Sequence, residues 1–312
     1  MSDRTGLGML DVAILDALAS VGAVPDGPYV KTQRVLDVLY DSAGIGPRIA
    51  HEPLCTMARP WVVHLLLVDF HGNVGSPDFE PASPRYTESR LAPLGLAALG
   101  AERAVRSPIP IGLVNGDLHV GGVRPPFDPS RVVAALRAVS AGAADRDLVD
   151  LVGRPSFPTG CDVELDVDAF VEGHETTLTT TAQLHIEGDR FVVTGLPPDA
   201  SASELARSIA ARVESAARWG DAAPGRLGRE RPLPPIIGVD DDSTADETRL
   251  VLTAEAGTTT AAMRSFLATL WHFRRAFAVQ LDRPLATVIR EAAVVAGGEQ
   301  IDEIERAIRH RA

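Results

Sequence analysis

Turn-forming segments divide the first sixty residues into three short amphipathic stretches. The stretch from about Leu7 to Val21 carries apolar residues at helical spacing, and a Pro-Asp-Gly-Pro turn at 25–28 ends it. A second helix is predicted from about Lys31 to Ser42, and a third from about Arg48 to Arg59, where Pro60 stops it.

The connection between the second and third helices is a tight glycine-containing turn at 44–47. Short helices joined in this way are typical of a helix-turn-helix, and the apolar run at 62–68 with the Gly-rich turn after it would supply a wing. The alternative is an ordinary small helical subdomain. Helix spacing alone favours that alternative.

An arginine–tyrosine pair follows the proline-punctuated loop after this run. The spacing of four leucines predicts a helix that starts near Arg85 and Tyr86, with Thr87 and Glu88 in its first turn, and these leucines are Leu91, Leu94, Leu96 and Leu99. A tyrosine beside an arginine at such a junction suits a nucleophile with a charge clamp. The alternative is a packing residue with a solvated hydroxyl, which the pattern taken alone favours.

The rest of the chain predicts an α+β fold. Residues 1–126, 127–260 and 261–312 are the three expected domains, with the first boundary at the Pro125–Pro126 pair. The expected strands are 109–114, 176–186, 191–194, 236–239 and 249–252, and the expected helices are 132–141, 148–152, a helix capped by Ser201 or Ser203, 260–281 and 285–311.

The charge of the chain argues against a generic nucleic-acid binder. Its net charge is −12, whereas such proteins usually have a basic face. Residues 28–126, however, carry nine basic and nine acidic residues, so this neutral region is compatible with a local arginine-lined groove. The N-terminus has no signal-peptide pattern, no apolar stretch reaches the ~18 residues of a membrane span, and the two cysteines form no CxxC pair. We therefore expect a cytoplasmic protein.

A long segment of the chain resembles the breakage–reunion domain of type IIA DNA topoisomerases, as in the A subunit of bacterial DNA gyrase. The similarity runs from Pro60-Trp61 through Leu67-Val68-Asp69, Gly72-Asn73 and Gly75-Ser76 to Arg85-Tyr86-Thr87-Glu88-Ser89-Arg90-Leu91. Weaker matches lie at 113–116, 125–126, 157–160, 195–197 and 277–280. The resemblance implies a winged-helix DNA-gate domain, a tower-like α+β domain and a short C-terminal helical segment where the family's coiled coil begins.

The resemblance also implies roles for individual residues. Tyr86 matches the family's nucleophile, which joins the 5′ phosphate of DNA and leaves a 3′ hydroxyl, and Arg85 is the adjacent charge clamp. The DNA-binding residues implied are Lys31 and Arg34 on the second helix, Arg48 on the third, and Leu118 near the family's base-pair wedge.

Cofactors and partners follow from the same resemblance. This chain carries no Walker-type phosphate loop and no recognisable acidic metal site, so Mg²⁺ and ATP are both expected on a gyrase B-like partner. The other expected partners are double-stranded DNA and a second copy of this chain, which would form a homodimer through the winged-helix region. The expected location is the nucleoid.

The sequence departs from the family at two sites of charge stabilisation. The family's histidine-rich turn is Ala43-Gly44-Ile45-Gly46 here, and its first-helix arginine falls near Ala13. The chain also ends where the family continues into its coiled coil. An alternative hypothesis is therefore a catalytically weakened paralogue that acts as a DNA-binding, mixed-dimer or drug-resistance factor. A plain winged-helix regulator is a third interpretation. Four histidines could compensate spatially: His51, His64, His71 and His119.

Overall fold

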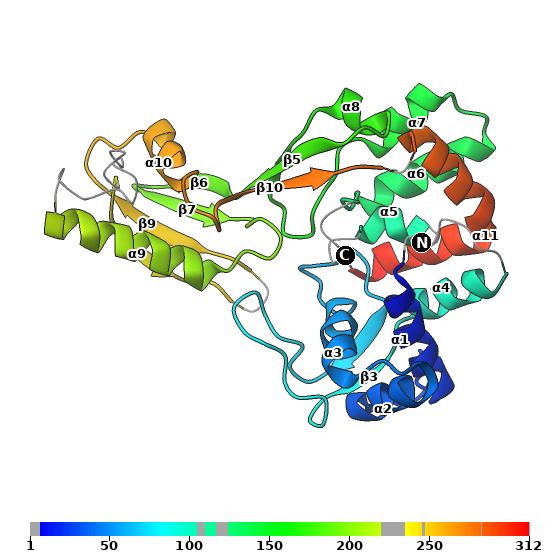
Figure 1. Cartoon of the computed structure of the whole chain (residues 1–312). Coiled ribbons are helices and arrows are strands. Elements are labelled where there is room, and N and C mark those ends of the chain that lie inside the picture. The colour runs from blue at the N-terminus through cyan, green and yellow to red at the C-terminus, as the bar shows by residue number, and fades with distance from the viewer. Residues whose placement is uncertain are drawn as a thin grey trace.

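The chain folds around two separate hydrophobic clusters (Figure 1). The structure is a computed structural model and describes residues 7–104, 110–116, 124–219, 235–244, 247–281 and 283–311. The first cluster takes residues from Leu7 to Leu178 and again from Val279 to Ile304, and the second takes residues from Ala182 to Phe273. The second cluster is thus an insertion between two segments of the first.

Three helices and a small sheet form the N-terminal part of the first cluster. Helices α1 (Met9–Ser20), α2 (Thr32–Ala43) and α3 (Pro47–Thr56) pack against one another. The turn between α2 and α3 places Gly44 at φ 69°, a left-handed conformation that favours glycine. Strands β1 (Val30–Lys31), β2 (Val68–His71) and β3 (Glu88–Leu91) form an antiparallel sheet in the order β1-β3-β2.

A helical layer completes the first cluster. It contains α4 (Pro93–Ala104), α5 (Pro110–Asn115), α6 (Pro129–Ser140), α7 (Asp145–Val152) and the long α11 (Leu285–Arg311). Helix α11, red in Figure 1, packs against α4, α5, α6 and α7. The last helix of the chain therefore returns to the core that the first helices begin.

A β-ribbon connects the two clusters. Strands β4 (Asp162–Glu164), β5 (Thr176–Thr181) and β10 (Arg274–Val279) form an antiparallel sheet in the order β10-β5-β4, and α8 (Val167–Val171) lies between β4 and β5 in the chain. In Figure 1 the paired β5 and β10 run between the two parts of the molecule.

The second cluster is built on a four-stranded antiparallel sheet. Its strands β6 (Gln183–Glu187), β7 (Arg190–Thr194), β9 (Leu250–Ala254) and β8 (Ile236–Asp241) are ordered β6-β7-β9-β8. Helices α9 (Ala202–Trp219) and α10 (Thr260–Leu267) contribute buried side chains to its core, including Leu205, Ile209 and Phe266.

Several sequence predictions are confirmed. The chain is mixed helix and sheet, α6 contains most of the helix expected at 132–141, β7 contains the strand expected at 191–194, and Ser201 precedes α9 as its cap. The three domain ranges, 1–126, 127–260 and 261–312, stay predictions.

Other predictions of secondary structure are wrong. The segment predicted as a strand at 109–114 is helix α5 from Pro110, because a run this short does not distinguish the two periods. The predicted strand at 176–186 is two strands in different sheets. Residues 274–279, expected in a helix, form β10, which pairs with β5. The apolar run at 62–68 is irregular up to residue 67 and enters β2 at Val68, and its role as part of a wing stays a prediction.

Candidate active site

Tyr86 lies in a tight turn immediately before strand β3. Its backbone N–H donates to the Ser83 carbonyl at 2.9 Å, and its side chain is 80% exposed. Arg85 is also exposed. The prediction that a helix begins at this pair is wrong: β3 follows the turn, and the helix begins only at Pro93. The reason is that Ser89 and Leu91 are buried with period two and pair with β2.

The residue after Tyr86 fixes the turn to the helical part of the cluster. The Thr87 side chain is fully buried, and its hydroxyl donates to the Thr32 hydroxyl at 3.0 Å. At the start of α2, the N–H of Thr32 donates to the Thr87 carbonyl and the N–H of Gln33 donates to the Pro84 carbonyl, both at 3.1 Å. Two of the otherwise unpaired donors of the α2 N-terminus are thus used to hold the tyrosine turn.

Lys31 is brought close to this turn by strand pairing. It pairs with Glu88 in the β1–β3 register, and its ammonium lies 2.9 Å from the Glu88 carboxylate. Exposed ion pairs of this kind contribute only about 0–1 kcal/mol. The Lys31 ammonium can therefore exchange this carboxylate for a phosphate at small cost.

An ordered polar network covers the same sheet. The Tyr29 hydroxyl donates to Asp69, whose carboxylate also accepts from Arg90 Nε at 3.0 Å. The Arg90 guanidinium lies 4.2 Å from the Tyr29 ring centroid, and the His71 ring stacks on Tyr29 at 3.5 Å. Burial and the neighbouring Asp69 raise the pKa of Tyr29, so this phenol stays protonated. Tyr29 is a structural hydrogen-bond donor here, in contrast to the exposed Tyr86.

Sequence reasoning missed most of this network. The signal available in the sequence was the spacing of polar residues two apart, at Asp69 and His71 and at Glu88 and Arg90. In the structure, Asp69 and His71 on β2 lie opposite Arg90 and Glu88 on β3. Of the four candidate histidines, His71 lies in this sheet beside the strand that follows Tyr86. His64 is buried and its Nε2 lies 2.7 Å from the Ser156 carbonyl, and His51 Nε2 lies 3.5 Å from Cys55 Sγ. His119 lies outside the described residues.

The remaining predicted DNA-binding residues are spread over the helices. Arg34 is exposed on α2, whose first turn contacts the Tyr86 turn, and Arg48 is exposed in the first turn of α3. Leu118 lies outside the described residues. The structure thus brings Lys31 and the start of α2 to Tyr86 and Arg85, whereas Arg48 lies on the next helix.

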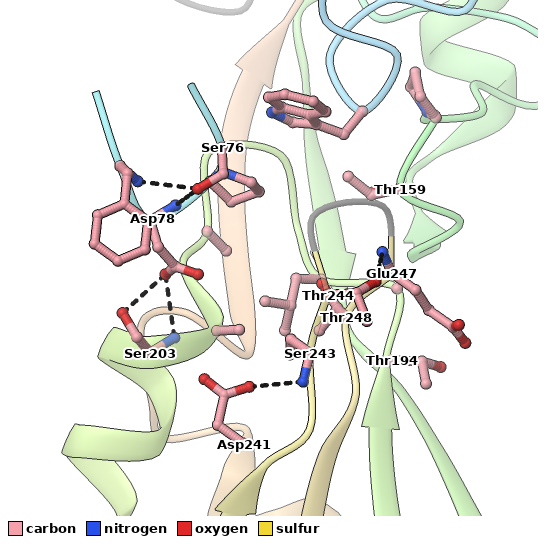
Figure 2. A pocket seen from close by; sticks show the side chains of 18 of the residues that line it. Ser76, Asp78, Thr159, Thr194, Ser203, Asp241, Ser243, Thr244, Glu247 and Thr248 are labelled. Carbon is pink, nitrogen blue, oxygen red and sulfur yellow. Dashed lines mark hydrogen bonds between the residues drawn. The ribbon is translucent and has the colours of Figure 1, made fainter. Parts of the chain in front are cut away.

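A cleft of about 1120 Å³ lies beside the loop that carries this turn (Figure 2). Loop residues Ser76 and Asp78 line one side together with Ser203, which is hydrogen-bonded to Asp78, and Thr159, Thr194 and Glu247 lie on the other side. Within the described ranges, no group of three or more His, Cys, Asp or Glu side chains is placed to hold a metal ion. None of the helices in those ranges is long and apolar enough to cross a membrane.

An exposed phenol next to cations suits attack on a large anionic substrate. A solvent-exposed phenol on a hydrogen-bonded turn can reach a backbone phosphate without enclosing it. Arg85 is the exposed residue directly before Tyr86, and Lys31 is ion-paired with Glu88, two residues after Tyr86. The arrangement is therefore compatible with phosphodiester chemistry on a polymer.

Comparisons with known proteins found A subunits of DNA gyrase and of DNA topoisomerase 4. The gyrase A protein of Streptococcus pyogenes serotype M3, a DNA gyrase component, is 26% identical over 282 residues, which cover 80% of this chain and 32% of that protein. The gyrase A protein of Streptococcus pneumoniae serotype 4 is 26% identical over 283 residues. The DNA topoisomerase 4 A protein of Synechocystis sp. is 31% identical over 200 residues, which cover 55% of this chain and 22% of that protein. No known family model matches the chain.

These matches support a relationship to the A subunits of type IIA topoisomerases. The chain spans about a third of the length of the gyrase relatives and about a fifth of the topoisomerase 4 relative. The similarity therefore concerns one part of those proteins.

Proposed function

We propose that this chain is a DNA-cleaving component of the type IIA topoisomerase A-subunit kind, with Tyr86 as its nucleophile. The observation that carries the proposal is the placement of Tyr86: an 80% exposed phenol on a turn held by hydrogen bonds, next to Arg85 and near Lys31. The named relatives support it, because they are A subunits of DNA gyrase and topoisomerase 4.

The reaction exchanges one phosphate ester for another. The Tyr86 hydroxyl oxygen attacks a backbone phosphorus, the phenol proton passes to solvent or a nearby base, and the bond to the 3′ oxygen breaks. That oxygen takes a proton and leaves as a 3′ hydroxyl, while the 5′ phosphate stays on the tyrosine. Arg85 stabilises the charge on the non-bridging oxygens. Reversal reseals the strand without a new phosphate donor.

The finer architecture belongs to the same proposal. We assign α2, the Gly44 turn and α3 to a helix-turn-helix, and the loop between β2 and β3 to its wing. The order β1-β3-β2 and the contacts among α1, α2 and α3 support this assignment. The second cluster corresponds to the tower-like domain. Arg34 and Arg48 are placed on the exposed sides of the two helices, where a DNA backbone could contact them.

Other components come from partners. A B-type subunit would supply Mg²⁺ and ATP hydrolysis, and a second copy of this chain would complete a DNA gate on the nucleoid. When bound, the metal ion would stabilise charge on the phosphate and the leaving oxygen. The residues of this chain would supply the nucleophile and hold the backbone.

The test is covalent trapping on DNA. The chain is incubated with a B-type subunit, Mg²⁺ and supercoiled DNA, and adducts are denatured with detergent and detected on the protein. We expect an adduct with the parent chain and none with Tyr86→Phe. Tyr86 is exposed, so this substitution changes the free energy of unfolding by no more than about 0.5 kcal/mol.

The two other tyrosines supply matched controls. Tyr40→Phe removes an exposed hydroxyl from α2, and Tyr29→Phe removes the donor to Asp69. Both variants should still form the adduct. A parental adduct that persists in Tyr86→Phe would exclude Tyr86 as nucleophile. DNA binding without any adduct would replace cleavage by the DNA-binding alternative.

A further inference from the structure

The chain passes between the two hydrophobic clusters twice, and both passages lie in the ribbon formed by β5 and β10. The chain leaves the first cluster after β5 and returns through β10, and at the crossing the Ala182 N–H donates to the Phe273 carbonyl at 2.8 Å. The ribbon is a narrow three-stranded sheet in the order β10-β5-β4, and it resists bending less than a packed interface between the clusters would. Contacts away from the ribbon must therefore set the angle between the clusters.

One such contact comes from the loop between β2 and β3. Asp78 in this loop accepts hydrogen bonds from Ser203 N at 3.2 Å and from Ser203 Oγ at 2.9 Å (Figure 2). It also accepts one from Ser201 Oγ. Asp78 belongs to a loop of the first cluster, whereas the two serines begin α9 in the second. We call Asp78, Ser201 and Ser203 the clasp. In Figure 1 the loop, in cyan, reaches toward the near end of α9.

The serine side of the clasp is fixed by further contacts within the second cluster. Ser201 is buried, its hydroxyl accepts from Glu204 N at 3.0 Å as the cap of α9, and its N–H donates to His272 Nδ1 at 3.1 Å. The neighbouring Arg275 donates to the Pro198 carbonyl at 2.7 Å. A carboxylate at the start of an 18-residue helix is also favoured by the helix dipole. The clasp is therefore a charge-assisted contact with a rigid target.

Hydrogen bonds within the loop, together with one from Arg59, order the segment from Asn73 to Ala82 that leads to the Tyr86 turn. Ser76 Oγ accepts from Asp78 N and Phe79 N at 3.2 and 3.1 Å, and Ala82 N donates to the Asn73 carbonyl at 3.0 Å. Arg59 Nε donates to the Val74 carbonyl at 2.9 Å. The turn that holds Tyr86 begins one residue after Ala82.

We propose that Asp78 is a positioning residue, and that the clasp couples the second cluster to the presentation of Tyr86. This inference rests on the proposed function. With the clasp formed, the second cluster and the tyrosine turn move as one unit against a bound DNA backbone. Without it, the second cluster is still held by the ribbon, by the close packing of Gly195 against the Thr159 and Gly160 carbonyls and by the Arg264–Asp162 ion pair, but the loop loses its outer anchor.

Hydrogen exchange tests the mechanical part without DNA or partner. In Asp78→Ala the amides of the 73–87 segment should exchange roughly tenfold faster than in the parent, because a charge-assisted anchor is removed. The double variant Asp78→Ser with Ser203→Asp moves the carboxylate to the other side of the clasp and should restore slow exchange. Asp128→Ala removes a comparable cap, the acceptor for Arg131 N at 3.0 Å on α6, and should leave this segment unchanged.

Adduct formation tests the positioning part. In Asp78→Ala the single-turnover rate of adduct formation should fall roughly tenfold or more, while the dissociation constant for duplex DNA stays within about twofold. The exchanged double variant should recover most of the rate. A merely structural contact would lower the adduct rate and raise the dissociation constant together, or would change neither.

The outcomes separate the two proposals. If exchange accelerates in Asp78→Ala but the adduct rate does not change, the positioning role is overturned. If exchange in the 73–87 segment is the same as in the parent, the clasp itself is overturned. A parent chain that forms no adduct overturns the proposed function, whereas its exchange data still decide whether Asp78 anchors the loop.

Discussion

Gly95 tests how α4 packs against Leu67, the residue directly before β2, in the sheet next to the Tyr86 turn. It lies in α4, where alanine ordinarily stabilises a helix by up to about 1 kcal/mol over glycine. A Cβ at this position, however, would lie 2.1 Å from the Leu67 carbonyl oxygen and 3.0 Å from its carbonyl carbon. The same oxygen accepts the Ala92 N–H at 3.0 Å, so it cannot move without loss of that bond. Gly95→Ala should therefore destabilise the protein.

The magnitude follows from these opposing effects. Overpacking against backbone costs about 1–3 kcal/mol, and this cost exceeds the gain in helix propensity. Gly298 in α11 is the matched control, because a Cβ there meets no atom within 4 Å. Gly298→Ala should stabilise the protein by about 0.5–1 kcal/mol. The two glycine-to-alanine changes are thus expected to have opposite signs.

Urea unfolding followed by circular dichroism measures both variants. The midpoint should move down for Gly95→Ala and up for Gly298→Ala, with unchanged slopes. Because the chain has two clusters, tryptophan fluorescence should accompany the dichroism to show whether they unfold together. A Gly95→Ala variant as stable as Gly298→Ala would refute the close approach of α4 to the Leu67 carbonyl.

Two pH-dependent predictions follow from buried groups. Burial raises the pKa of the Cys55 thiol to about 12 and that of Cys161 to about 11, so neither should react with a thiol reagent at neutral pH until the protein unfolds. Since the native state holds these protons more tightly, the free energy of unfolding should fall as the pH rises above about 9, and replacement of both thiols by alanine should reduce that slope. Burial, with a smaller contribution from Arg275, lowers the pKa of His272, opposed by Glu204 and Asp78, so stability should fall as the pH drops below 6.5. Burial also lowers the pKa of His51, so His272→Gln should reduce that acid-side slope in urea titrations without removing it, and an unchanged slope would contradict the assignment.

Much of the local structure could be predicted from short-range patterns. The three N-terminal helices, α6, the β6–β7 hairpin and α9 all carry local signals, namely apolar spacing, turn residues and caps such as Ser201. The segment after Tyr86 could not be predicted in this way. Leu91, Leu94 and Leu99 fit a helical period, yet Glu88–Leu91 pairs with β1 and β2 because Ser89 and Leu91 are buried between them.

One part of the candidate site could be predicted from the sequence, and another part required the tertiary structure. The similarity of residues 60–91 to the A subunits of type IIA topoisomerases is readable from the sequence, and with it the choice of Tyr86 and Arg85, because motif identity is local information. The folded chain was needed to show that the start of α2 holds the tyrosine turn, and that Asp78 meets Ser203, 125 residues further along the chain. Such contacts depend on the packing of whole elements, which no local pattern of residues encodes.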